Sequence, residues 1–309
     1  MKVSWKKFNA LGTEVTISAI LTTENTELLN RAEYLVTQFE ENFSRFIANN
    51  ELDQFNKSEG NLKVSDEMIK LLLEAKKWQD FSHNIFDPTI INNLEQLGYD
   101  QSFLEIKEDK VKPNLEKLKK DFLKRPKLND LIINKQEVFK PNNLRLDLGG
   151  FGKGYIIDKL GQEIFSKVNN YWLSAGGDLL ISGHNETQVS WSVGVQNPYE
   201  PTKEIFHLKT KGEKLGIATS GIWQRQGDKG GIKWHHLIDP RTGLPTENNI
   251  LAVTAIADSA TKADVLAKTI LILGEIEGLN FINKDLTSAA LIFLKDGGIV
   301  FSSRVKNYL

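Results

Sequence analysis

The chain has 309 residues, with 39 basic and 40 acidic side chains and a formal net charge of −1. Nucleic-acid-binding proteins usually carry a basic excess, so no nucleic-acid partner is expected here. The chain has no cysteine, which excludes thiolate nucleophiles, thiolate zinc sites, iron–sulfur clusters and disulfides.

The apolar runs are far shorter than a membrane-spanning helix, so no transmembrane segment is expected. The N-terminal segment is basic, but it has neither the apolar core of a signal peptide nor a cysteine for a lipid. We therefore expect a soluble chain without an export signal. It would be cytoplasmic, or periplasmic or otherwise extracytoplasmic if a signal was removed.

The first third of the chain shows both helical and strand periodicity. Alternating apolar and polar residues predict a strand over residues 14–21, and apolar residues at helical spacing predict a helix over residues 26–43. Ser65 can cap a second helix. The buried stripe expected on that helix is Met68, Leu71, Leu72, Ala75 and Trp78.

Residues 100–145 are rich in lysine and asparagine and are interpreted as a variable insertion or loop. A loop is also expected over residues 221–231, and a helix over residues 260–273 that ends at Gly274. The later strands expected are 171–173, 179–182, 189–195, 205–209, 251–257, 289–294 and 299–302. This grouping indicates an α+β fold with mixed or antiparallel sheets and packed helices, in a single domain over residues 1–309.

A glycine-rich turn from Asp147 to Gly154 lies between an apolar segment and a predicted helix. Glycines let a ligand approach the backbone closely, and the N–H groups at a helix start attract anions. Lys153 adds a positive charge beside them. The turn therefore suits a diphosphate, and a tight structural connection is the alternative.

A second glycine pair, Gly176 and Gly177, precedes Asp178 after another apolar strand. The glycines again permit close approach of a ligand, and the carboxylate could bind a hydroxyl or orient a partner. A hairpin turn with a solvated aspartate explains the same residues.

Two adjacent histidines, His235 and His236, are followed by Asp239 and a Pro-Arg-Thr-Gly turn. Neighbouring side chains on a strand point to opposite faces, so only one histidine need face a site. A neutral histidine can act as a general base towards a hydroxyl. The alternatives are a hydrogen-bonded structural imidazole and a plain turn.

Asp264 lies among small and apolar residues on the predicted helix 260–273, where it could hold a metal or a phosphate. Lys268 follows four residues later, with the acid first, which is the favourable order for a helical salt bridge. Both interpretations stay open.

Taken together, these motifs resemble the ApbE family of FAD:protein FMN transferases. The family segments DLGG-x-x-KG, AGGD, ATSG, HHxIDPxTG and A-D-x-x-A correspond in order to residues 147–154, 175–178, 218–221, 235–243 and 263–267. Earlier matches lie at residues 11–13, at 43–46 with 51–56, and at 86–89. The resemblance covers residues 11–274.

The resemblance implies an ApbE-like fold that binds FAD in a cleft with Mg²⁺ beside the diphosphate. It further implies transfer of FMN to a threonine or serine of an acceptor flavoprotein or electron-transfer subunit, with release of AMP. The FAD-binding residues that it implies are Leu11, Phe86, Asp87, Pro88, Asp147, Lys153, Gly177, Asp178, Ser220 and Leu237. The metal positions implied are Gly150, Asp264, Ala267 and Lys268. His236 and Asp264 are the implied catalytic residues.

One position departs from the family pattern. The family has a threonine that supports the metal where this chain has Lys268, and Thr269 comes one residue later, on another face of the helix. An ammonium group repels Mg²⁺. We therefore expect Lys268 to replace part of the metal's charge and to touch the diphosphate, with weak or no dependence on Mg²⁺.

Two other functions fit the same motifs. An FAD diphosphatase would use water as the acceptor and release FMN and AMP. A non-enzymatic FAD-binding protein would have lost transfer through Lys268. A purely structural protein would require every motif to be a coincidence.

Overall fold

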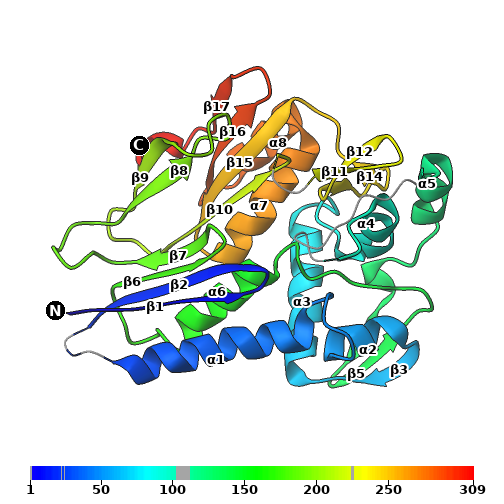
Figure 1. Ribbon diagram of the computed structural model, residues 1–309, viewed down its shortest axis with the longest axis horizontal. Coiled ribbons are helices and arrows are strands. Elements are labelled where there is room, and N and C mark those ends of the chain that lie inside the picture. The colour runs from blue at the N-terminus through cyan, green and yellow to red at the C-terminus, as the bar shows by residue number, and fades with distance from the viewer. Residues whose placement is uncertain (1, 22, 24, 102–111, 224–225) are drawn as a thin grey trace. The chain divides into compact units, whose positions relative to one another are not determined.

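An antiparallel sheet of eight strands is the largest element of the structure, a computed structural model that describes residues 2–21, 23, 25–101, 112–223 and 226–309 (Figure 1). The chain groups into two compact units. The first comprises Met1–Glu40, Phe151–Gly221 and Asn248–Leu309, and the second comprises Glu41–Gly150 and Ile222–Glu247. The single domain over residues 1–309 stays a prediction.

The large sheet belongs to the first unit and has the strand order β1-β2-β6-β7-β10-β15-β16-β17, with every neighbouring pair antiparallel. Its strands are β1 Lys2–Ala10, β2 Thr13–Leu21, β6 Tyr171–Ala175, β7 Asp178–Ser182, β10 Leu215–Gly221, β15 Ile250–Ala257, β16 Ala289–Leu294 and β17 Ile299–Phe301. Every residue of β16 is buried, which explains its unbroken apolar sequence. The sheet confirms the α+β prediction and the strands expected along it, and β1 and β10 are strands that the sequence analysis missed.

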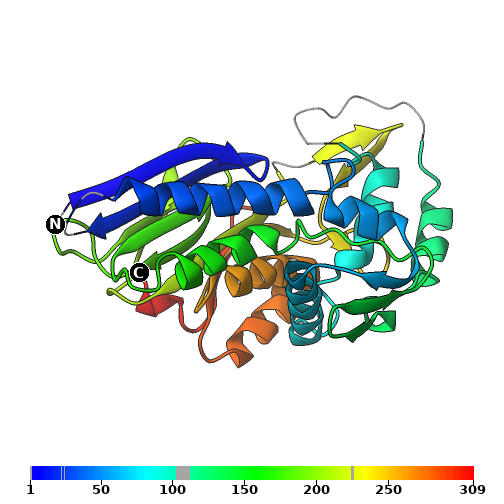
Figure 2. The same ribbon diagram turned by 90° about the horizontal axis from the view of Figure 1, so that it is seen from below.

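Helices α6 (Gly152–Glu163) and α7 (Ala260–Leu273) pack on this sheet, α6 against β6 and β7 and α7 against β10 and β15. Helix α1 (Thr26–Phe43) lies beside α6, where the ring centroids of Phe39 and Tyr155 are 5.8 Å apart (Figure 2). The predicted helices at residues 26–43 and 260–273 are thus confirmed. Helix α8 (Glu275–Lys284) follows α7 directly.

The first unit is completed by a hairpin, β8 (Ser192–Gln196) with β9 (Glu204–Lys209), and by a short 3-10 helix at Val305–Asn307. The hairpin confirms the two strands expected near residues 189–195 and 205–209, with β8 beginning later than expected.

Helices α6 and α7 touch at Gly154. A Cβ atom on Gly154 would lie 2.6 Å from the Cα atom of Thr261, so only glycine fits there. Asp158, one turn further along α6, accepts hydrogen bonds from the N–H groups of Ala260 (2.8 Å) and Thr261 (2.9 Å) at the start of α7. This capping aligns the two helix starts.

A Gly154→Ala substitution is expected to lower the free energy of unfolding by about 1–3 kcal/mol, because the added methyl group meets backbone and must push the helices apart. Urea unfolding followed by circular dichroism measures this. Gly161→Ala is the matched control in the same helix, since its Cβ would meet the flexible end of Leu180 and, at 3.5 Å, the Tyr171 hydroxyl oxygen, but no backbone atom. Equal stability of the two variants would contradict the predicted clash.

The second unit holds the remaining described elements. They are α2 Glu51–Lys57, β3 Gly60–Lys63, α3 Asp66–Phe81, a 3-10 turn at Pro88–Ile90, α4 Ile91–Leu97, α5 Leu115–Leu123, a 3-10 turn at Leu128–Asp130, β4 Ile132–Asn134, β5 Glu137–Lys140, β11 Gln226–Lys229, β12 Ile232–His235, β13 Ile238–Asp239 and β14 Leu244–Pro245. An apolar core joins α4, α5, β12 and β13. Its buried members are Leu94, Leu97, Tyr99, Leu118, Trp234 and Ile238.

Helix α3 confirms the helix expected after Ser65, whose side chain accepts a hydrogen bond from the Met68 N–H (3.0 Å), and the whole predicted stripe is buried. The loop expected over residues 221–231 was wrong in its described part, because β11 and β12 form a hairpin there. Residues 112–145 of the expected insertion carry α5, β4 and β5, while residues 102–111 lie outside the described residues.

None of the helices in the described ranges combines the length and apolar character needed to cross a membrane.

Candidate functional site

Two lysines and two aspartates form a buried cluster in the first unit, here called the four-charge cluster. Lys153, in the first turn of α6, pairs with Asp178 at the start of β7. Lys268 pairs with Asp264 one helical turn away in α7. Only 3% of the Asp178 side chain and 1% of the Asp264 side chain are exposed. The Asp264–Lys268 salt bridge predicted from the sequence spacing is therefore confirmed, and its carboxylate is buried.

The two ion pairs act on one another. Burial raises the pKa of Asp178, and the Asp264 carboxylate raises it further by repulsion. Lys153 and Lys268 both lower the pKa of Asp178 by attraction. The two ammonium groups thus offset part of the cost of burying the Asp178 carboxylate.

The cluster also bears on the Mg²⁺ expectation. One oxygen of Asp264, Oδ1, binds the Lys268 ammonium group, and the other, Oδ2, is buried with no hydrogen-bond partner among the described residues. Ala267 offers only its backbone, and no group of three or more metal-ligating side chains occurs in the described ranges. Mg²⁺ prefers carboxylate and neutral oxygen ligands. Asp264 is the only carboxylate among the implied metal positions, and the Lys268 ammonium group beside it would repel the ion. The implied metal positions in this unit therefore do not fit a divalent cation.

Thr269 does not replace the missing ligand. It is fully buried, and its hydroxyl has no hydrogen-bond partner among the described residues.

Three further predicted residues of the first unit lie at strand ends. Leu11 occupies the tight turn between β1 and β2 with a φ of 59°, a left-handed conformation that is uncommon for leucine. Gly177 has a φ of 92°, and no atom lies within 4 Å of the place where a Cβ would be, so its backbone is open to a neighbour. Ser220 is buried near the end of β10.

In the second unit, the turn at Phe86–Pro88 is bonded to the glycine-rich turn. The Asp147 N–H donates to the carbonyl oxygen of Pro88 (2.8 Å). The Phe86 ring lies so close to Gly150 that a Cβ there would be 2.8 Å from it. The structure thus brings together predicted site residues that are about 60 positions apart in the sequence.

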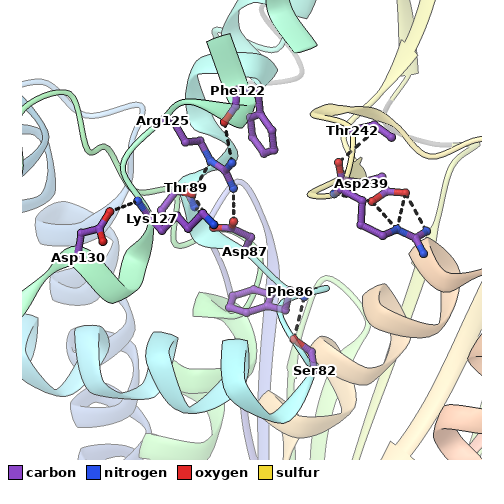
Figure 3. Close-up of polar contacts among 11 residues, drawn as sticks. Ser82, Phe86, Asp87, Thr89, Phe122, Arg125, Lys127, Asp130, Asp239 and Thr242 are labelled. Carbon is purple, nitrogen blue, oxygen red and sulfur yellow. Dashed lines mark hydrogen bonds and ion pairs between the residues drawn. The ribbon is translucent and has the colours of Figure 1, made fainter. Parts of the chain in front are cut away.

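Both acidic residues predicted in this unit are paired with arginines that the sequence analysis did not identify as site residues. Asp87 forms an ion pair with Arg125 (Figure 3). Asp147 lies 3.5 Å from Nε of Arg45, whose guanidinium group stacks on the ring of Tyr99, 4.6 Å from its centroid. These pairs neutralise carboxylates that would otherwise repel a phosphate.

The two histidines differ in their surroundings. The ring of His235 is held by backbone groups, with Nε2 2.9 Å from the carbonyl oxygen of Thr246 and Nδ1 accepting from the Leu237 N–H (3.3 Å). His236 is half-buried and meets the edge of the Tyr99 ring. Leu237 itself is buried. The assignment of His236 to the site stays a prediction.

The Asp239-Pro-Arg-Thr-Gly turn is stabilised internally. The Arg241 guanidinium group donates to the Asp239 carboxylate through contacts of 2.8–3.1 Å, and the Gly243 N–H donates to the Asp239 carbonyl oxygen (2.7 Å). Asp239 therefore serves the turn itself, as the structural interpretation of this motif requires.

An antiparallel sheet covered by helices, with a glycine turn, Lys153 at the start of α6 and Lys268 in α7, defines an α+β protein with groups suited to a phosphate-bearing ligand. The model of the ApbE family matches residues 11–293, and the chain belongs to this family. The resemblance and the ApbE-like fold expected from the sequence are thereby confirmed.

Two curated relatives carry the name FAD:protein FMN transferase. The Vibrio cholerae protein is 24% identical over 275 residues, covering 88% of this chain and 80% of that protein. The Haemophilus influenzae protein is 23% identical over 269 residues, covering 84% and 76%. The crystal structure of the ApbE protein from Thermotoga maritima has a TM-score of 0.88 at 25% identity and covers 99% of both chains.

Proposed function

We propose that this protein transfers FMN from FAD to a threonine or serine hydroxyl of an acceptor protein and releases AMP. The observation that carries the proposal is the extent of the family match, residues 11–293, together with relatives named for this reaction. The acceptor is a flavoprotein or an electron-transfer subunit.

In this reaction the acceptor oxygen attacks the phosphorus of the FMN half and forms a new P–O bond. The bond to the bridging oxygen breaks, AMP leaves with that electron pair, and the hydroxyl proton is lost. Negative charge grows on the phosphate oxygens, so catalysis requires fixed positive groups close to them. Lys153 and the N–H groups at the start of α6 are the donors we assign to the diphosphate.

Lys268 supplies charge that a divalent cation would otherwise bring. The ion pair with Asp264 supports this assignment, because it fixes the Lys268 ammonium group in place. Only 13% of the Lys268 side chain is exposed. With the Lys268 ammonium group at this position, no metal ion is needed there to balance the phosphate charge. Mg²⁺ dependence is therefore weak or absent in this proposal.

His236 is the residue we assign to the acceptor hydroxyl, because both ring nitrogens of His235 lie against backbone groups. A neutral imidazole can take the hydroxyl proton as the new P–O bond forms.

The direct test is to incubate the protein with FAD and an acceptor domain carrying a modifiable threonine. We expect a fluorescent acceptor band on a denaturing gel. We also expect the acceptor mass to increase by that of one FMN less one water molecule. Release of FMN and AMP with an unmodified acceptor would instead identify an FAD diphosphatase. Intact FAD after prolonged incubation would identify a non-enzymatic FAD-binding protein.

A further inference from the structure

Arg125, in the segment expected to be a variable insertion, reaches back to a predicted FAD-binding turn. It follows helix α5, and only 13% of its side chain is exposed. Its guanidinium group makes an ion pair with Asp87 and a 2.9 Å hydrogen bond from Nε to the hydroxyl oxygen of Thr89 (Figure 3). Its Nη1 donates to the carbonyl oxygen of Phe122 (2.8 Å), and its carbon Cζ lies 3.4 Å from the centroid of that ring.

These contacts engage both oxygens of the Asp87 carboxylate. Oδ1 accepts from the Thr89 N–H (2.8 Å) and from the Thr89 hydroxyl (2.7 Å), and Oδ2 pairs with Arg125. The Asp87 side chain is 6% exposed. A buried carboxylate whose two oxygens are both bonded within the protein is suited to fixing the turn that carries it.

The same turn is fixed on its other side to the glycine-rich turn. The Pro88 carbonyl oxygen accepts from the Asp147 N–H, and the Phe86 ring lies against Gly150. A continuous chain of contacts therefore runs from Arg125 through Asp87 and Pro88 to Asp147. Movement of the Phe86–Pro88 turn would shift the backbone of the glycine-rich turn as well.

We infer that Arg125 is a positioning residue for FAD, which holds the Phe86–Pro88 turn and, through it, the Asp147–Gly150 turn in the FAD-binding arrangement. This inference rests on the proposed function. Asp87 then acts on FAD through the backbone of its turn, and the segment that carries Arg125 is part of the binding apparatus. An arginine suits this role because its planar group makes several fixed bonds at once, which lysine cannot do.

The test compares Arg125→Met, Arg125→Lys and Asp87→Asn with the unaltered protein. We expect both the Kd for FAD and the KM for FAD to rise about 10-fold in Arg125→Met, with kcat changed less than about 2-fold, as for a loss of binding that is equal in ground and transition states. The Kd for FAD of Arg125→Lys should lie between the values of the unaltered protein and of Arg125→Met. The Asp87→Asn substitution keeps an oxygen for the two bonds from Thr89 and loses mainly the charge that pairs with Arg125. The double variant Arg125→Met/Asp87→Asn should therefore be no weaker in FAD binding than Arg125→Met alone.

Glu95→Gln is the matched control. It breaks another arginine–carboxylate pair of the same unit, in which Arg145 holds Glu95 at 2.6 and 2.8 Å, and it should leave the Kd for FAD unchanged. An unchanged Kd in Arg125→Met and Arg125→Lys, with transfer intact in the unaltered protein, would overturn the inference. If the unaltered protein transfers no FMN, the proposed function fails instead, and the Kd for FAD, measured by flavin fluorescence, still decides the role of Arg125.

Discussion

Replacing Lys268 by methionine is expected to slow FMN transfer by about 100-fold, because it removes a fixed positive charge from the proposed phosphate site. The unaltered protein should keep its activity in the presence of a chelator, since the charge is part of the chain. The measurement is the initial rate of acceptor flavinylation, with and without a chelator. Lys268→Thr restores a hydroxyl at this position and is expected to gain both Mg²⁺ binding, measured by calorimetry, and chelator sensitivity.

Lys262→Met provides the matched control for Lys268→Met. Lys262 belongs to the same helix, is 12% exposed and pairs with Asp285 at 2.8 Å, so it is a lysine of similar exposure with an aspartate partner. Its loss should reduce stability and leave the transfer rate of the folded protein unchanged. Loss of activity of the unaltered protein with a chelator, and its return with added Mg²⁺, would show that Lys268 does not replace the metal.

Lys153→Met is expected to lower the free energy of unfolding by about 3–5 kcal/mol, because it leaves Asp178 buried without its cation. The pKa of Asp178 is already raised in the folded protein, by burial and by Asp264. The folded state therefore binds this proton more tightly than the unfolded state, and stability falls as pH rises above the ordinary carboxyl value of 3.8. Because Lys153→Met raises this pKa further, the loss should be larger at pH 8 than at pH 5 in urea unfolding.

A second substitution separates the unpaired charge from lost packing. In Lys153→Met/Asp178→Asn the buried charge is gone, so most of the stability and its pH dependence should return. A double variant as unstable as Lys153→Met at both pH values would mean that lost contacts of the lysine stem, and not the unpaired carboxylate, cause the effect.

Local signals made parts of this fold predictable. Helix α7 begins after Ser259, whose side chain accepts from the Lys262 N–H (3.2 Å), and it ends at Gly274, which has a φ of 84°. The end of the helix was predicted from Gly274, because a terminal glycine acts within a few residues. The ion pair of Asp264 and Lys268 was predictable for the same reason.

Other parts depended on partners far along the chain. Arg125 meets Asp87 across 38 positions, and it stands among exposed lysines that conceal it in the sequence. The β11–β12 hairpin has four polar or glycine residues in its first strand, Gln226 to Lys229, so no apolar alternation marks it. Strand β1 was missed because most of its residues are only partly buried or exposed. Tertiary pairing, and not local preference, decides such segments.

Strand β1 stands at the end of the sheet order, so one side of its backbone has no strand partner among the described residues. An edge strand of nine residues offers unpaired backbone groups to which a strand of another chain can pair, and such pairing begins aggregation. Lys2, Lys6 and Lys7 lie along this strand, and Lys6 and Lys7 form ion pairs with Glu33 and Glu14. Joining a second chain there would require stripping water from these charges. These lysines thus oppose the addition of another strand at the β1 edge of the sheet.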